Sequence, residues 1–272
     1  MGFQFQSSNP TLESMREARG LVSDETDTAT LKGVADKTAL LVGLATIAGG
    51  AAYAFLPLAG GVMLACCLAT LVIGIGIAWS LAGNPANART LAPIYALVEG
   101  AFLGLVTKWL DFMLLSAGGS TAAVGGSLAL PAFIITISCV VAMLGLYRAG
   151  LLRPTETFKS VIYTFTAGVM LAYLVMFVIS LFGVQMPFLS LGSAMRGGQE
   201  ALIGLGLNVA ILGLASLWLI IDFGTIEGIV RSQQPKVMEW YGGFVLLVTL
   251  AWIYYEAVKL AFRVAMLLNR RD

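Results

Sequence analysis

Long apolar runs, separated by short polar breaks, make up the chain after residue 37. From Thr38 onward, runs of apolar residues alternate with breaks that are rich in Gly, Pro and charged side chains. A helix needs about 20 residues to cross the hydrocarbon core of a bilayer. The pattern predicts seven membrane-spanning helices, at residues 38–56, 58–82, 91–112, 126–147, 160–182, 200–222 and 240–262.

Two of these spans need a further argument about where they end. No residue from Thr38 to the one before Arg89 is charged, and a single helix of that length would far exceed the bilayer thickness. We therefore expect the chain to reverse direction at Pro57, because proline interrupts helices. After Asp222, apolar residues continue at helical spacing, which predicts one or two further turns and places Asp222 inside the membrane edge.

Polar segments flank the membrane part. Residues 1–37 carry four basic and six acidic side chains and lack the apolar core of a signal peptide, so we interpret them as a polar tail. A short amphipathic helix is expected at 11–20 within this tail, which either docks a partner or is a disordered lead-in. The predicted organisation is thus a tail at 1–37, a helical membrane domain at 38–264 and a basic carboxyl-terminal tail at 265–272.

Composition narrows the function classes. Of the 272 residues 58% are hydrophobic and only 11% are charged, and mean hydropathy is +0.89, which is incompatible with an ordinary soluble domain. The net charge of +1, without a basic block, argues against a nucleic-acid partner. The absence of histidine excludes imidazole-dependent catalysis and histidine-ligated zinc, and the three cysteines lie in apolar runs as small hydrophobes. We expect neither an enzyme nor a cofactor.

Basic residues predict the orientation in the membrane. Short loops rich in Lys and Arg resist translocation. On the amino-terminal side of the seven spans there are ten such residues: Arg16, Arg19, Lys32, Lys37, Arg89, Arg148, Arg153, Lys159, Arg231 and Lys236. The opposite side has six, namely Lys108, Arg196, Lys259, Arg263, Arg270 and Arg271. The amino terminus is therefore expected in the cytoplasm.

Three carboxylates inside the spans are the candidate ion or proton site: Glu99, Asp222 and Glu256. Ionisable groups in spans generally face the bundle interior or a wet cavity and mark function. Asn208 shares a helical face with Asp222, and Thr249 shares one with Glu256, so both are pore-lining candidates. The alternatives are a protonated Glu99 used for packing and an Asp222 that is merely interfacial.

Depth along the helices predicts which carboxylates meet. If the last hairpin reverses near Gln233, Asp222 faces about residue 244, and Glu256 lies roughly 18 Å further along the axis. Glu99 is closer to the level of Asp222, so these two are the expected pair. Glu256 is then either a separate polar site or an interfacial anchor. In the second case Lys259 and Arg263, one and two turns further along the helix, form a salt-bridged cap with it and extend (snorkel) to the far membrane interface.

Several segments resemble the bacterial branch of the Bax inhibitor-like transmembrane family. They are PIYALVEG at 93–100, IDFGTIE at 221–227, KVMEWYG at 236–242, LAWIYYE at 250–256 and SSNP at 7–10. The resemblance covers nearly the whole chain. It implies a seven-helix bundle in which the other six helices surround the last one, in a bacterial cytoplasmic (inner) membrane.

The same resemblance implies a function. Members of this family are associated with a pH-sensitive calcium leak, in which one aspartate on each of the last two helices acts as the sensor. Asp222 matches the first position, and Glu256 is the acidic residue late in the last helix. Calcium prefers hard oxygen ligands, and carboxylates are the anionic ones available here. The alternative is a non-transporting regulator that binds another membrane protein such as an AAA protease complex.

Overall fold

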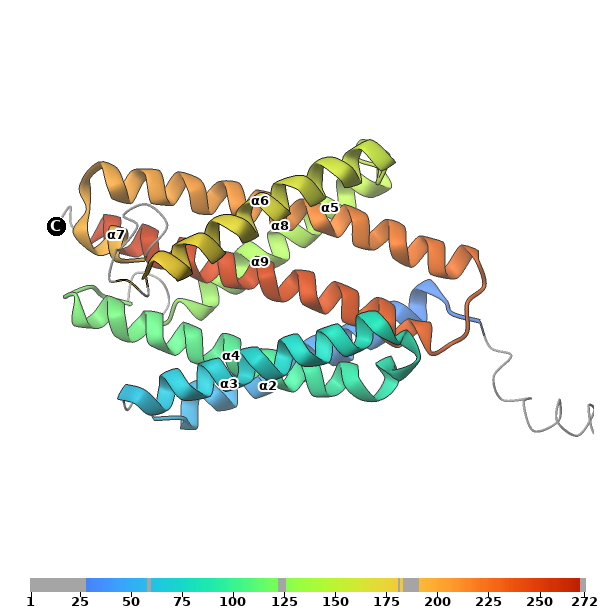
Figure 1. Ribbon diagram of the computed structural model, residues 1–272, viewed down its shortest axis with the longest axis horizontal. Helices are drawn as coiled ribbons and strands as arrows, with labels where there is room; N and C mark the ends of the chain where they lie inside the picture. Colours follow the sequence, from blue (N-terminus) through green and yellow to red (C-terminus); the bar gives the residue numbers. More distant parts are fainter. Residues whose placement is uncertain (1–27, 58–59, 122–125, 181, 183–190, 270–272) are drawn as a thin grey trace, which may run out of the picture.

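Helices account for nearly all of the regular structure. The computed structural model describes residues 28–57, 60–121, 126–180, 182 and 191–269 (Figure 1). The helices are α2 (Leu31–Phe55), α3 (Gly60–Gly83), the 3-10 turn η1 (Pro85–Asn87), α4 (Ala88–Ser116), α5 (Ala129–Arg148), α6 (Glu156–Ser180), α7 (Gly192–Arg196), α8 (Gly198–Arg231) and α9 (Met238–Leu268). Within these ranges no strand occurs apart from a single isolated bridge between Thr28 and Pro235.

Seven of these helices are long and apolar enough to cross a bilayer, namely α2, α3, α4, α5, α6, α8 and α9. All seven predicted spans are therefore confirmed, and the chain is an all-α integral membrane protein. The predicted reversal between the first two spans falls between Phe55, the end of α2, and Gly60, the start of α3. The predicted extension of the sixth span beyond Asp222 is also present, since α8 continues to Arg231.

The first span starts earlier than predicted, at Leu31 rather than at residue 38. Thr30 is the reason, because its side chain accepts a hydrogen bond from the Gly33 backbone N–H at 2.9 Å and caps the helix. The end of the predicted polar tail thus belongs to α2. At the other end, α9 continues to Leu268, into the predicted carboxyl-terminal tail, whereas the short helix expected at 11–20 lies outside the described residues.

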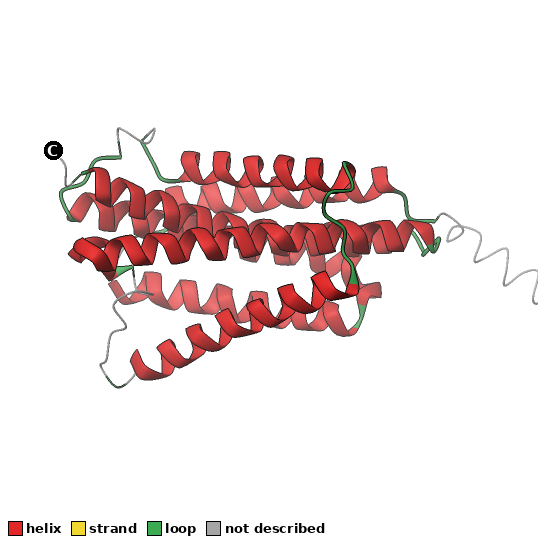
Figure 2. Ribbon diagram, turned by 90° about the horizontal axis from the view of Figure 1, so that it is seen from above, coloured by secondary structure: helices red, strands yellow, loops and turns green. Residues whose placement is uncertain are grey.

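Helix α9 occupies the centre of the bundle (Figure 1). Figure 2 shows the same bundle of helices from above. Helix α9 packs against α2, α4, α5 and α8 and the short α7, while α3 packs mainly on α4 and α6 mainly on α8. More than half of the apolar window of α9, 56%, is buried inside the protein, compared with 11% for both α3 and α6. The outer helices therefore present most of their apolar surface to lipid, and α9 presents its surface to other helices.

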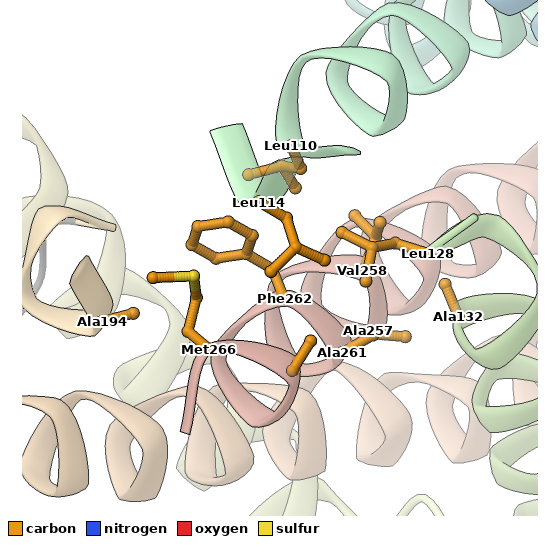
Figure 3. Close-up of a cluster of buried hydrophobic side chains, with 11 residues drawn as sticks. Leu110, Leu114, Leu128, Ala132, Ala194, Ala257, Val258, Ala261, Phe262 and Met266 are labelled. Atoms are coloured by element: carbon orange, nitrogen blue, oxygen red, sulfur yellow. The ribbon is translucent and has the colours of Figure 1, made fainter. Parts of the chain in front are cut away.

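A cluster of buried apolar side chains fixes one end of α9 (Figure 3). Phe262 is fully buried and lies among residues of α4, α5 and α7. The other fully buried members at this junction are Leu110, Leu114, Leu128, Ala132, Ala257 and Val258. This packing places the second half of α9, with its charged residues, inside the bundle.

Two glycines allow α2 and α4 to pack closely. A Cβ added at Gly100 would overlap the backbone of Ala45, and one added at Gly104 would overlap the backbone of Gly49. The two glycines are four residues apart on α4, which is the spacing that lets helix backbones approach in membranes. The α2–α4 pair has the most extensive contact in the bundle.

Candidate functional site

Asp222 and Thr249 form a buried polar pair between α8 and α9. Asp222 is 3% exposed and Thr249 is 5% exposed. The Thr249 side chain hydrogen-bonds the Asp222 carboxyl group. The second carboxyl oxygen, Oδ2, has no hydrogen-bond partner among the described residues. The pair is therefore incompletely satisfied, and no Lys or Arg in the described part of the chain forms an ion pair with the Asp222 carboxylate.

Glu256 lies in a second polar cluster of the same two helices. Its side chain is fully buried, at 1% exposure. Asn208 of α8 donates through Nδ2 to Glu256 Oε2 at 2.7 Å, and Lys259 donates through Nζ to Oε1 at 2.7 Å. Lys259 also donates to the Tyr173 hydroxyl of α6 at 3.3 Å. This carboxylate has a cation and an amide as partners, so its charge is compensated inside the bundle.

The same cluster extends toward the end of α9. Arg263, 4% exposed, donates through Nη1 to Ser193 Oγ of α7 at 3.0 Å. A small cavity of about 10 Å³, large enough for one water molecule, lies between Asn208, Lys259, Arg263 and Tyr173. The Oδ1 atom of Asn208 is unpartnered among the described residues, so the amide has one free acceptor in this region.

The expected snorkelling cap at Glu256 is wrong in its location, although the salt bridge to Lys259 exists. Lys259 is 7% exposed, so its side chain is covered by the protein and does not extend into solvent. The physical reason is that α9 continues to Leu268 and α7 packs against it. The three charged residues of these two turns of α9, Glu256, Lys259 and Arg263, therefore lie inside the protein.

Glu99 lies in a third neighbourhood, on the side of α4 that faces α3. The Tyr95 side chain, one turn earlier on α4, hydrogen-bonds its carboxyl group. Its Oε2 atom lies 3.4 Å from the position that a Cβ would take at Gly74 of α3. Glu99 is partly exposed, whereas Asp222 is buried.

The expected pairing of Glu99 with Asp222 does not form. Helices α4 and α8 both pack on α9 and make at most marginal contact with each other, because α9 lies between them. The three carboxylates therefore occupy three separate neighbourhoods. Among the described residues no group of three or more Cys, Asp or Glu side chains is arranged to hold a metal ion.

The two pore-lining candidates also have partners that the sequence did not predict. Asn208 contacts Glu256 instead of sharing a site with Asp222, and Thr249 contacts Asp222 instead of sharing one with Glu256. The hairpin register explains part of this difference. The turn between α8 and α9 runs from Ser232 to Val237, so Asp222 meets residue 249 rather than 244.

Sequence reasoning did not single out Asp111, which is 5% exposed. Its Oδ2 accepts hydrogen bonds from the Tyr53 hydroxyl at 2.7 Å and the Ser127 hydroxyl at 2.6 Å, and its Oδ1 accepts one from the Leu128 N–H at 2.9 Å. Asp111 thereby connects α2, α4 and the start of α5. The feature of the sequence that could have identified Asp111 is its position as a carboxylate at the end of an apolar run. With three donors on its two oxygens, its role is structural.

Glu239 was not singled out either, although it is 3% exposed in the first turn of α9. It accepts hydrogen bonds from both the backbone N–H and the hydroxyl of Thr30, each at 3.1 Å. A Cβ added at Gly33 would overlap the Glu239 carboxylate, so a larger residue there would displace this carboxylate from Thr30. Glu239 therefore ties the start of α2 to the start of α9.

The two buried carboxylates of the α8–α9 interface, Asp222 and Glu256, have different partners. Glu256 carries a charge that the Lys259 ammonium group compensates at 2.7 Å. Asp222 has a hydroxyl neighbour and a free oxygen, so a change in its charge must be met by water, a cation or a helix movement. Of the sequence-predicted residues, Glu256 is paired with a cation, whereas Asp222 is the fully buried one with a carboxyl oxygen that has no partner among the described residues.

Comparison with known proteins gives the family. No match was found among curated proteins or among solved structures. The sequence model of the family described as "Bax inhibitor 1 like" matches residues 8–266, which include the first six spans, all but the last two residues of the seventh, and the Asp222–Thr249 pair. With the seven-helix architecture and this match over nearly its whole length, the chain belongs to the Bax inhibitor 1 like family.

Proposed function

We propose that this membrane protein is a pH-sensitive cation leak, with calcium as the cation, and that Asp222 is the residue that controls it. The observation that carries the proposal is the buried Asp222 carboxyl between α8 and α9, with Oδ2 unpartnered among the described residues. Ionisable groups at such positions in membrane helices mark ion and proton pathways.

A charge in the dry interface between α8 and α9 has a high free-energy cost. A neutral Asp222 carboxyl is compatible with its single hydroxyl neighbour, Thr249. An ionised carboxylate there has no cationic partner, so water or a cation must enter between α8 and α9. Entry of water supplies the path, and the carboxylate with the Thr249 hydroxyl supplies hard oxygen ligands of the kind that calcium prefers.

The direction in which calcium flux changes with pH follows from this cost. Raising the pH favours the ionised form of Asp222, which hydrates the interface. Calcium flux is therefore expected to rise as the pH is raised through the titration of Asp222. Glu256 is a poor candidate for the same role, because Lys259 already neutralises it at 2.7 Å.

Reconstitution into liposomes that contain a calcium indicator tests the proposal. The wild type is expected to show pH-dependent flux, and Asp222→Asn is expected to give a flux that no longer varies with pH, since the amide does not titrate. The matched control is Glu200→Gln, which makes the same change on α8 at a partly exposed acid that pairs with Arg196. An unchanged pH profile in Asp222→Asn would exclude Asp222 as the controlling residue. Absence of flux in the wild type at every pH would favour the non-transporting regulator instead.

We also propose that the amino terminus faces the cytoplasm of a bacterial cell, with the protein in the cytoplasmic membrane. The excess of Lys and Arg on the amino-terminal side of the spans supports this orientation. Labelling of a single cysteine placed at Lys236, in the α8–α9 turn, by a membrane-impermeant reagent tests it. Labelling in intact cells would contradict the orientation, and labelling only after the membrane is opened is the expected result.

A further inference from the structure

Besides the Asp222 site, the structure contains a basic cleft at the amino-terminal side of the bundle. The cleft has a volume of about 540 Å³ and lies where the end of α5, the α5–α6 loop and the end of α8 meet. Its lining includes Arg148, Arg153 and Arg231, with one acid, Glu227. The volume falls within the ordinary range of ligand pockets.

Two of the three arginines have guanidinium groups without a partner in the described part of the chain. Glu227 accepts a hydrogen bond from the Tyr147 hydroxyl at 2.6 Å and forms an ion pair with Arg231 at 3.3 Å. No hydrogen bond or ion pair to a described residue is recorded for the guanidinium groups of Arg148 and Arg153. The one acid of the cleft is therefore engaged, and the cleft has a net positive charge that the protein does not neutralise.

The backbone of the loop holds this arrangement. Gly150 ends α5 with a φ of +71°, a conformation that favours glycine, and its N–H donates to the Tyr147 carbonyl at 3.0 Å. The Arg153 guanidinium folds over this glycine, 3.1 Å from the position of an added Cβ. At Gly224 of α8 an added Cβ would overlap the Pro154 ring, so the glycine lets the loop approach α8. The cleft is thus shaped by two positions that favour glycine, Gly150 and Gly224.

The position of the cleft indicates where its ligand comes from. Arg148 and Arg153 stand at the ends of membrane-spanning helices, where lipid headgroups lie. Leu151, between them in sequence, is 72% exposed and offers an apolar side chain beside the cleft. Basic pockets between transmembrane helices bind anionic headgroups, because guanidinium groups match phosphate oxygens in charge and geometry.

We propose that this cleft binds the phosphate of an anionic phospholipid headgroup, with Arg148 and Arg153 as the residues that contact the phosphate. Arg231 adds positive charge from the opposite wall while it holds Glu227 aside. The lipid chains would lie along the outside of the bundle next to Leu151. The proposal does not depend on whether the protein conducts ions.

Equilibrium binding of fluorescent phosphatidylglycerol to the purified full chain in detergent tests the proposal. The wild type is expected to bind phosphatidylglycerol more tightly than zwitterionic phosphatidylcholine, with an affinity that falls as salt is added. The double variant Arg148→Ala and Arg153→Ala is expected to weaken phosphatidylglycerol binding about thirtyfold, since each basic residue near an anionic headgroup contributes roughly a factor of five.

The matched control is the double variant Lys32→Ala and Arg89→Ala, which removes the same charge from exposed positions on the same side of the bundle but outside the cleft. It is expected to retain nearly wild-type affinity and helical content. Equal weakening in the two double variants, or equal affinity of the wild type for the two lipids, would overturn the proposal. Competition by inorganic phosphate as strong as by the lipid would overturn the assignment to a lipid.

Discussion

At the scale of single residues, four carboxylates of this protein are similarly buried but differ in their hydrogen-bond and ion-pair partners. Glu256, Asp111 and Glu239 are as buried as Asp222, and each has several hydrogen-bond donors. Asp222 has one hydroxyl neighbour and an unpartnered oxygen. Glu256, Asp111 and Glu239 stabilise particular helix contacts. Asp222 differs from them because one of its carboxyl oxygens has no hydrogen-bond partner among the described residues.

The sequence identified three carboxylates inside the spans, of which Asp222 and Glu256 are fully buried, but it did not predict their partners. Glu99, Asp222 and Glu256 were identifiable because an ionisable residue in an apolar run is rare. Their partners depend on the rotation of each helix and on the register of the last hairpin. The register of that hairpin differs by a few residues from the expected one, so Asp222 meets Thr249 and not a residue near 244. Asp111 and Glu239 were overlooked because both lie near span ends, where a charge is ordinary.

The buried ion pair between Glu256 and Lys259 predicts an asymmetric response to mutation. Glu256→Gln leaves the Lys259 ammonium buried without its carboxylate and is expected to lower the free energy of unfolding by about 3 to 5 kcal/mol. The double variant Glu256→Gln and Lys259→Met removes both charges and is expected to recover most of that loss. Thermal unfolding in detergent, followed by helical circular dichroism, measures both. A single variant as stable as the wild type would show that the pair is not the interaction described.

At the scale of elements, close contacts between helix backbones decide which helices pair. The seven spans were predictable because the period and length of apolar runs are local properties of the sequence. Their ends were less predictable, since α2 starts where Thr30 caps it and Glu239 binds that cap from α9. The GxxxG spacing at Gly100 and Gly104 is common in apolar spans, and only the structure identifies α2 as the helix that approaches it.

The α2–α4 contact predicts a position-dependent effect of adding one methyl group. Gly104→Ala places a Cβ against the Gly49 backbone and is expected to cost about 1 to 3 kcal/mol of stability through overpacking. Gly43→Ala is the matched control, because nothing lies within 4 Å of an added Cβ there. It is expected to be neutral or slightly stabilising, since alanine favours helix over glycine. Equal effects of the two changes on the melting temperature would contradict the close approach.

At the scale of the whole molecule, α9 connects the other parts. It packs against α2 and α4 on one side of the bundle and against α5 and α8 on the other, and it carries both Thr249 and Glu256. Local sequence patterns do not predict this central place, which the resemblance to the family implied. Because α4 and α8 are separated by α9, the pairing of Glu99 with Asp222 required a contact that the topology does not provide.

The central claim is that the charge of Asp222 controls opening between α8 and α9. Infrared titration of the protein in proteoliposomes, with calcium flux recorded in the same preparation, tests it most directly. We expect the band of a protonated carboxyl group to disappear over the pH range in which flux rises. Both changes are expected to be absent in Asp222→Asn and retained in Glu200→Gln. A flux that rises while this band is unchanged, or that keeps its pH response in Asp222→Asn, would contradict the account.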